Sequence, residues 1–327
     1  MILRPDSSPL SRNIEDYPEG IIIPIDKPYR WTSADVIRKI KFAAIRHFGK
    51  KNLKVGHAGT LDPLATGVLL VCIGKATKLA ETLQSHDKEY VAGITFGATT
   101  PSYDLEKEID RFFPHEHITA DAVRDALPAF VGEQDQIAPL FSAKSVDGVR
   151  AYELARKLHR EGKTLDDAAE ELIRVSRIHI SELELVRFGT GRNEGSEDRA
   201  TRGTEAGGPQ AERSGGVSEA NVLEPLSCRS ATKASGRINV TDNSALGLPR
   251  AVVRMACSKG TYVRAFARDL GEALGSGAHL DSLQRSRSGI FRVEDALSVE
   301  QAIKTVSAKT LSDSNLNSNA CCKTQQA

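Results

Sequence analysis

The 327-residue sequence lacks several features that would reveal a protein's class at once. Its five cysteines are odd in number and without zinc-ligand spacing, which predicts a reducing compartment and no structural metal site. It has no stretch of about 18 apolar residues that could cross a membrane, and no glycine-rich phosphate loop ending in Lys-Ser or Lys-Thr. We therefore expect a cytoplasmic protein with no cofactor, no metal and no membrane partner.

An overall basic charge is absent as well. Lysine and arginine number 44, against 43 aspartates and glutamates, so a nucleic-acid surface would have to come from local clustering. Basic residues do cluster within 38–54 and within 259–292. Each cluster could equally be a solvated helix face. The hydrophobic content of 40% is enough for a sizeable core in one large or two medium domains.

Apolar periodicity predicts strands and helices in an irregular order. The predicted strands are 21–25, 68–73, 90–96, 172–188 and 250–257. The predicted helices are 33–48, which Ser33 would cap, 76–83, one from about 119, 150–161 and 262–274, and a hairpin is expected at 142–148. Strand signals come in adjacent runs instead of alternating regularly with helices. We expect the α+β class: a mixed, mainly antiparallel sheet with flanking helices.

The composition changes sharply in the second half of the chain. Between residues 190 and 221, Val217 is the only strongly apolar residue. Such a stretch cannot bury enough apolar surface to offset its ordering entropy. We expect a disordered insertion at about 190–247, not needed for function, that interrupts a folded domain at 21–295. Residues 1–20 would be an N-terminal extension and 296–327 a short, loose tail.

The most informative segment is 56–67, Gly-His-Ala-Gly-Thr-Leu-Asp-Pro-Leu-Ala-Thr-Gly. It places Asp62 among glycines, directly before the apolar run 68–73. Glycines allow a ligand's backbone to approach closely, so a single carboxylate at the mouth of a buried strand is a candidate for chemistry. Taken alone, an aspartate before a proline is more often a turn former or a helix cap.

This dodecamer closely resembles the hallmark of the bacterial tRNA pseudouridine-55 synthases of the TruB type, whose catalytic aspartate corresponds to Asp62. The segment 257–264, Cys-Ser-Lys-Gly-Thr-Tyr-Val-Arg, resembles the family's second hallmark, whose arginine pairs with that aspartate and corresponds to Arg264. A guanidinium suits a bidentate contact that keeps a pocket carboxylate ionised. The resemblance covers about 20–190 and 248–295. It implies a curved mixed sheet with the active-site cleft across its middle.

The resemblance also implies residues that bind the substrate. Tyr90 corresponds to a tyrosine that stacks on the flipped-out target base, although a tyrosine on a half-buried strand is as often a core residue. His57 corresponds to a residue that fills the gap left in the RNA stack, the alternative being a loop histidine bonded to nearby backbone. Tyr262 and Leu283 correspond to positions that line the uracil pocket.

The implied activity is isomerisation of uridine 55 in the T-arm of tRNA to pseudouridine, by a monomer without DNA or an obligatory protein partner. Asp62 would either attack C1′ or remove a proton from C2′ to give a glycal, and the sequence leaves both open. The chain departs from the family at Thr100-Pro101-Ser102 and at Gln284, which puts peripheral RNA contacts in doubt.

Two alternative functions remain. A guide-RNA-dependent rRNA pseudouridine synthase would need an RNA-binding PUA domain and protein partners. Only 36 residues follow Phe291, so we expect that domain to be absent. A non-catalytic RNA-binding or RNA-folding protein could share the fold. The presence of Asp62, Tyr90 and Arg264 argues against it.

Overall fold

The computed structural model describes residues 1–139, 141, 145–146, 149–150, 175–190, 238 and 240–307. The predicted helix at 150–161, most of the predicted insertion and the tail after 307 lie outside these ranges. The described elements are η1 (Ile14–Asp16), β1 (Ile21–Lys27), α1 (Ser33–Phe48), β2 (Val55–Ala58), β3 (Ala65–Ile73), η2 (Gly74–Leu79), α2 (Ala80–Ser85), β4 (Lys88–Phe96), β5 (Ala98–Thr99), β6 (Arg111–Phe112), α3 (Ala120–Ala126), η3 (Leu127–Phe130), β7 (Gly132–Gln136), β8 (Ser145–Val146), β9 (Val149–Arg150), β10 (Ser176–Thr190), η5 (Ser244–Leu246), β11 (Pro249–Cys257), α6 (Val263–Ala273), β12 (Ala278–Ser288), β13 (Phe291–Arg292) and α7 (Val299–Ser307).

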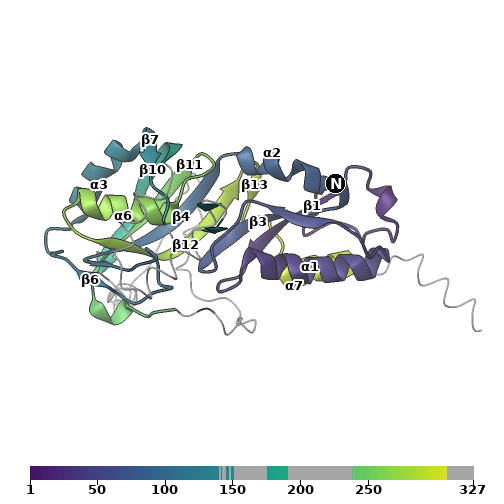
Figure 1. Cartoon of the computed structure of the whole chain (residues 1–327), viewed down its shortest axis with the longest axis horizontal. Coiled ribbons are helices and arrows are strands. Elements are labelled where there is room, and N and C mark those ends of the chain that lie inside the picture. Colours follow the sequence, from purple (N-terminus) through teal and green to yellow (C-terminus); the bar gives the residue numbers. More distant parts are fainter. Residues whose placement is uncertain are drawn as a thin grey trace, which may run out of the picture.

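One large sheet runs through the described part of the molecule in the order β1-β3-β12-β4-β11-β10-β7, with β2 beside β3 and β13 beside β12. Its pairs are antiparallel except for β3 with β12, which is parallel. Helices α1 and α7 pack together at one end of the sheet, and α3 and α6 lie at the other (Figure 1). The predicted α+β class, with a mixed and mainly antiparallel sheet, is confirmed.

The periodicity signals correspond to β1, β3, β4, β10, β11, α1 and α6 within a few residues. The predicted helix at 76–83 is divided into the 3₁₀ segment η2 and the short helix α2. The pattern did not predict β12, a central strand that carries several polar residues. The apolar alternation typical of a strand is interrupted in β12, because its buried residue Arg285 is charged.

The N-cap of helix α1 lies one residue earlier than predicted. Its cap is Thr32, whose hydroxyl accepts a hydrogen bond from the backbone N–H of Asp35 while the Asp35 carboxylate accepts one from the backbone N–H of Thr32. This reciprocal pair is a capping box, which needs an acidic or amide side chain at the third helical position. Asp35 stands at that distance from Thr32 and not from Ser33, which is the first residue of the helix.

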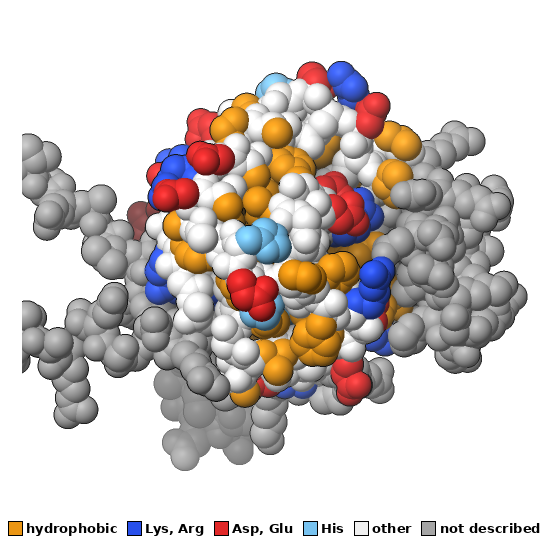
Figure 2. Space-filling view, turned by 90° about the vertical axis from the view of Figure 1, so that its left-hand side faces the viewer, with side chains coloured by type: hydrophobic (Ala, Val, Ile, Leu, Met, Phe, Trp, Pro, Cys, Tyr) orange, Lys and Arg blue, Asp and Glu red, His pale blue; other side chains and the backbone are white. Residues whose placement is uncertain are grey.

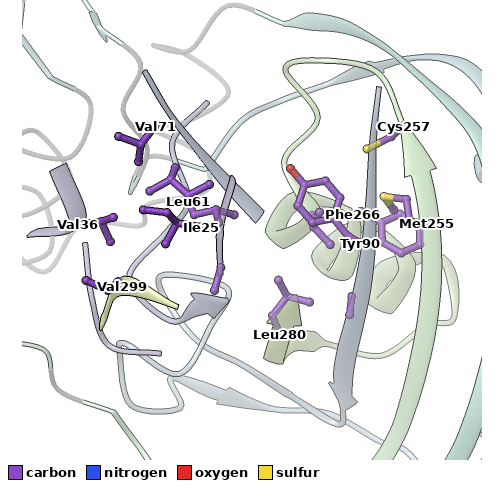
Figure 3. Packing of buried hydrophobic residues seen from close by; sticks show 14 of the residues in the cluster. Ile25, Val36, Leu61, Val71, Tyr90, Met255, Cys257, Phe266, Leu280 and Val299 are labelled. Carbon is purple, nitrogen blue, oxygen red and sulfur yellow. The ribbon is translucent and has the colours of Figure 1, made fainter. Parts of the chain in front are cut away.

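The buried core extends under both ends of the sheet. Figure 3 shows one group with Ile25, Val36, Leu61, Val71 and Val299, and a second with Tyr90, Met255, Phe266 and Leu280. The strand pairs β3–β12 and β12–β4 connect the two groups.

The end of the molecule that carries α3 and β6 has no continuous basic surface on its visible, described part. Figure 2 shows both charge signs scattered among apolar and neutral side chains there. A large cationic surface formed by the described residues would therefore lie on another face. None of the described helices has the length and apolar character that a bilayer span requires.

Candidate active site

Asp62 lies in the loop between β2 and β3, and the loop is tied down on both sides of it. The hydroxyl of Ser33 donates to the carbonyl of Leu61 (3.1 Å) and accepts from the N–H of Leu61 (3.0 Å). The N–H of Ala65 donates to the carbonyl of Asp62 (3.1 Å). The Asp62 side chain is 38% exposed, so its carboxylate is held in place and still open to a ligand.

Gly67 allows β3 to approach β12 closely. Its φ is +96°, and a Cβ added there would lie 2.3 Å from the backbone oxygen of Arg285, its partner in the parallel pair. Only glycine fits such a contact. The sequence suggested that the glycines of this segment serve the approach of a ligand; at Gly67 the structure shows the approach of a neighbouring strand.

Arg285 fastens the two ends of the Asp62 loop from inside. Its side chain is 2% exposed, and it donates to the carbonyls of Val68 (2.7 Å) and Gly59 (3.1 Å). The basic residues at 259–292 were one possible nucleic-acid surface. Because Arg264 and Arg285 are both buried, this cluster is not one continuous surface.

Arg264, the second residue of α6, pairs with Asp62 as expected. Its Nε lies 2.9 Å from Oδ2 of Asp62, and its side chain is 5% exposed. The terminal nitrogens donate to the carbonyls of Ser102 (3.1 Å) and Phe141 (2.9 Å). The expected bidentate fork onto Asp62 is therefore not formed. The Nε–H is not directed at an acceptor, so the contact is an ion pair, while backbone carbonyls set the orientation of the guanidinium.

Asp104 is a second carboxylate of the site, which the sequence did not single out. Its Oδ2 lies 3.7 Å from Nη1 of Arg264, and its Oδ1 accepts from the Ser102 hydroxyl (2.6 Å) and the Glu106 N–H (2.9 Å). Burial by itself would lower the pKa of Arg264, but the neighbouring Asp62 and Asp104 charges outweigh it and raise that pKa. The sequence feature that could have pointed to Asp104 is the polar Ser-x-Asp-x-Glu run soon after β4.

Lys27 is a third ionisable residue beside Asp62 that sequence reasoning missed. Its side chain is fully buried, and Nζ donates to the carbonyls of Pro28 (2.9 Å), Trp31 (2.6 Å) and Pro63 (3.3 Å). Burial lowers the pKa of Lys27 to about 7, and the charge of Asp62 opposes that shift. The ammonium thus joins the end of β1 to the residue that follows Asp62.

A small, open pocket lies beside these groups. Because a bulge interrupts the pairing of β12 with β4 between Leu280 and Ser282, four consecutive residues of β12 face it. The bulge is fixed by Asp281, which accepts two hydrogen bonds from Arg250 (2.7 and 2.8 Å). The residues lining the pocket are Asp62, Leu64, Ala65, Asp104, Arg264, Leu280, Asp281, Ser282 and Leu283. Apolar walls with a few convergent polar groups are typical of a ligand site.

The other predicted site residues lie around this pocket and do not line it, except Leu283. Tyr90 is 9% exposed and packs beside Phe266 and Met255 (Figure 3). Burial raises the pKa of its phenol, which also feels the charge of Arg285. Tyr262 lies just before α6 and its backbone N–H donates to the side chain of Gln136 (2.8 Å).

His57 lies on β2, on the approach to Asp62. It is partly buried, and its Nδ1 has no hydrogen-bond partner among the described residues. Burial lowers the pKa of His57, and the charge of Arg285 adds to the effect. Its ring is therefore neutral at pH 7 and has an unused polar atom. No cluster of three or more potential metal ligands occurs among the described residues.

Comparison with known proteins gives consistent matches. Residues 46–192 match the model of the TruB family pseudouridylate synthase (N terminal domain), and residues 264–318 match the tRNA pseudouridylate synthase B C-terminal domain. The chain is 44% identical to tRNA pseudouridine synthase B of Phocaeicola vulgatus over 285 residues, 87% of this chain and 92% of that protein. It is 36% identical to tRNA pseudouridine synthase B of Deinococcus radiodurans over 280 residues, 85% of this chain and 77% of that protein.

The fold also resembles a solved structure. A chain in the crystal structure of a Cbf5-Nop10-Gar1 complex aligns with a TM-score of 0.50 at 22% identity. The alignment covers 91% of this chain and 56% of that chain. At this identity the likeness concerns the fold alone, and it agrees with the mixed sheet described above.

Proposed function

The chain belongs to the TruB family of pseudouridine synthases, and from this premise we propose that it isomerises uridine 55 in the T-loop of tRNA to pseudouridine, with Asp62 as the catalytic carboxylate. It is an isomerase that acts on uridine in RNA. The relatives named above are tRNA pseudouridine synthases, which supports tRNA as the substrate. The exact nucleotide and the roles of individual residues are our proposal.

The ion pair between Asp62 and Arg264 carries this proposal. The reaction breaks the N1–C1′ bond, turns the uracil, joins C5 to C1′ and removes the C5 proton, without redox change. A carboxylate can start it by attack on C1′ or by proton abstraction at C2′, and either role needs the anion. Arg264, at 2.9 Å, supplies the positive charge that keeps Asp62 ionised when a nucleotide excludes water.

We assign the pocket beside Asp62 to the target uracil. Such a base is reached only after extrusion from the folded RNA, and it must stay bound while it turns. Leu280 and Leu283 provide apolar walls that allow rotation without fixed hydrogen bonds. Tyr90 packs beside Phe266 and does not line this pocket, and we assign it the stacking role on the extruded base from the family resemblance.

His57 we assign to the RNA strand next to the extruded nucleotide. Its neutral ring can stack in a gap between bases. Tyr262 precedes α6 close to Arg264 and contributes to the rim of the same site. These two assignments depend on the family resemblance more than on the geometry.

The test is incubation with an unmodified tRNA transcript, followed by mapping of pseudouridine at each position. We expect modification at uridine 55 by the wild-type protein alone, and none by Asp62→Asn. Because RNA affinity comes mainly from phosphate, shape and stacking contacts, the variant should bind tRNA within about threefold of wild type. A matched control is Asp121→Asn, which removes a carboxylate 84% exposed on α3.

The outcomes separate the proposal from its alternatives. Substantial product from Asp62→Asn would refute the role of Asp62. Tight tRNA binding by the wild-type protein without any product would favour a non-catalytic RNA-folding protein. Activity that appears only after addition of a guide RNA and protein partners would favour a guide-dependent rRNA synthase.

A further inference from the structure

A short segment at the end of the predicted insertion contacts the loops that build the active site. We call Ile238 and residues 240–248 the strap. It was expected to be part of a disordered insertion without a role, but the described residues form the 3₁₀ turn η5 and make specific contacts on both sides of the site. In Figure 1 this is the green segment below β6. Most of these residues lie within the predicted insertion at 190–247, and the structure gives them defined contacts.

The first end of the strap contacts the Asp62 side of the site. The guanidinium of Arg30 donates from Nη2 to the carbonyl of Ile238 (2.7 Å). The backbone N–H of Arg30 donates to the carbonyl of Pro63 (3.0 Å), the residue after Asp62. Arg30 also has φ of +62°, which is uncommon for a residue with a side chain and requires support from its surroundings.

The middle of the strap contacts the Asp104 side. The N–H of Thr241 donates to the carbonyl of Leu105 (2.9 Å), next to Asp104. This bond fixes the loop in which the Ser102 carbonyl accepts a hydrogen bond from Arg264. The strap therefore contacts the chain neighbour of Asp104 directly, and the chain neighbour of Asp62 through Arg30.

A third contact reaches the pocket wall. The side-chain nitrogen Nδ2 of Asn243 lies 3.4 Å from Nε2 of His279, a fully buried residue that precedes Leu280. Since Nδ1 of His279 faces the carbonyl of Ala98 at 2.9 Å, Nδ1 carries the proton and Nε2 accepts from Asn243. Burial lowers the pKa of His279, which keeps the ring neutral in this role.

We propose that the strap is a positioning element for the isomerisation, holding the Asp62 loop and the Asp104 loop at the separation that both need to flank Arg264. The proposal rests on the proposed function. Asp62 follows β2 and Asp104 follows β5, so the two carboxylates come from loops far apart in the sequence. A segment bonded to the Asp104 loop at Leu105, and to the Asp62 loop through Arg30, restricts their relative movement before RNA binds. Such preorganisation acts on the rate of the chemical step more than on RNA affinity.

Two deletions test this idea. In the first, residues 192–236 are replaced by a Gly-Ser linker of about 20 residues, which spans up to roughly 70 Å and leaves the strap intact. In the second, residues 192–247 are replaced by a short Gly-Ser turn, which is feasible because Thr190 pairs with Pro249 across the sheet. We expect the first variant to keep the single-turnover rate of wild type. The second should lose about tenfold to a hundredfold in that rate.

Point variants test the individual contacts in the full-length chain. Asn243→Leu removes the donor to His279, and Arg30→Met removes the donor to Ile238. The matched control is Asp242→Asn, an exposed strap residue whose carboxylate accepts only from Ser244 among the bonds described here. Both contact variants should slow single turnover at saturating enzyme with tRNA affinity and thermal unfolding midpoint nearly unchanged, and the control should match wild type.

A local spectroscopic readout separates positioning from a general loss of stability. Trp31 is the only tryptophan of the chain and is the neighbour of Arg30. Its emission should shift in the strap deletion and in Arg30→Met, and stay unchanged when only 192–236 are replaced. A folded strap deletion with the wild-type rate would overturn the inference, as would unchanged Trp31 emission in a slow strap deletion or a slow Arg30→Met variant. If wild type itself makes no pseudouridine, the proposed function fails, whereas the emission test still reports on the strap.

Discussion

At the scale of single residues, Arg264 has three different tasks at once. Its Nε side faces Asp62, one terminal nitrogen bonds the carbonyl of Ser102 and the other that of Phe141. The positive charge of the guanidinium thus lies beside the Asp62 carboxylate, and its contacts connect three separate loops. Sequence resemblance predicted the pair of Arg264 and Asp62 but not the two carbonyl contacts. Every residue has a backbone carbonyl, so the sequence does not show which carbonyls accept from Arg264.

Arg264→Lys should therefore lose most of the activity although it keeps the positive charge. A lysine ammonium is a compact donor on a flexible stem. It cannot reach all three groups that surround the edge of the planar guanidinium. We expect a fall in the single-turnover rate of about a hundredfold, with smaller effects on tRNA binding. Arg254→Lys is the control, since Arg254 is partly exposed and pairs with Glu182 and Glu184 on β10. Near-normal turnover by Arg264→Lys would mean that charge alone suffices.

Lys27 leads to a prediction on pH and stability. Burial lowers its pKa to about 7 in the folded protein, whereas in the unfolded chain it titrates near about 10.4. Between these values the unfolded state binds more protons, so the free energy of unfolding rises with pH. The advantage of wild type over Lys27→Met should grow from about pH 7 to pH 9.5, by at most about 1.4 kcal/mol per pH unit.

Urea unfolding of both proteins at several pH values measures this difference. Below about pH 7 the difference should level off, because Lys27 is then protonated in both states. Lys75→Met, on the exposed face of η2, is the control for loss of a lysine without loss of a buried contact. A difference that stays constant from pH 7 to 9.5 would show that Lys27 keeps its proton throughout.

At the scale of elements, the sequence predicted what depends on local periodicity. Strand β4 alternates buried Tyr90, Ala92 and Ile94, and helix α6 follows a strong apolar stripe, so both were expected at nearly their observed positions. The N-cap of α1 was one residue off because Thr32 and Ser33 are both good caps. The position of Asp35 decides between them, through the geometry of the capping box.

Buried charged residues could not be predicted when the groups that bond to them lie far away in the sequence. Strand β12 carries Arg285 in the core, and that residue is stable there only because the carbonyls of Gly59 and Val68 accept from it. Asp104 was missed for the same reason, since its partner Arg264 lies 160 residues away in sequence. The motif residues Asp62 and Arg264 could thus be predicted from the sequence. Asp104 and Arg285 could not, because only the folded structure brings their partners close to them.

At the scale of the whole molecule, the site is assembled at the middle of the sheet, beside β3 and β12. Strand β3 brings Asp62 from the side of α1, and α6 brings Arg264 from the other side, with β12 between them. Lys50 and Lys54 of the predicted basic cluster at 38–54 lie at the surface. Together with Lys75 and Lys78 they border a second, open hollow.

This lysine-lined hollow predicts how tRNA binding responds to salt. The chain as a whole is nearly neutral, so phosphate contacts must come from local groups such as Lys54 and Lys78. Binding should weaken steeply as salt rises, and each of Lys54→Gln and Lys78→Gln should reduce the slope of log Kd against log salt by about one. Arg124→Gln, which removes an exposed arginine of α3 at the opposite end, is the control.

Because these lysine contacts hold phosphates and do not touch the reacting base, the single-turnover rate of the lysine variants at saturating enzyme should stay near that of wild type. Unchanged slopes in both lysine variants would place the RNA on another face, and a normal slope with a reduced rate would mean that these lysines serve the chemical step instead.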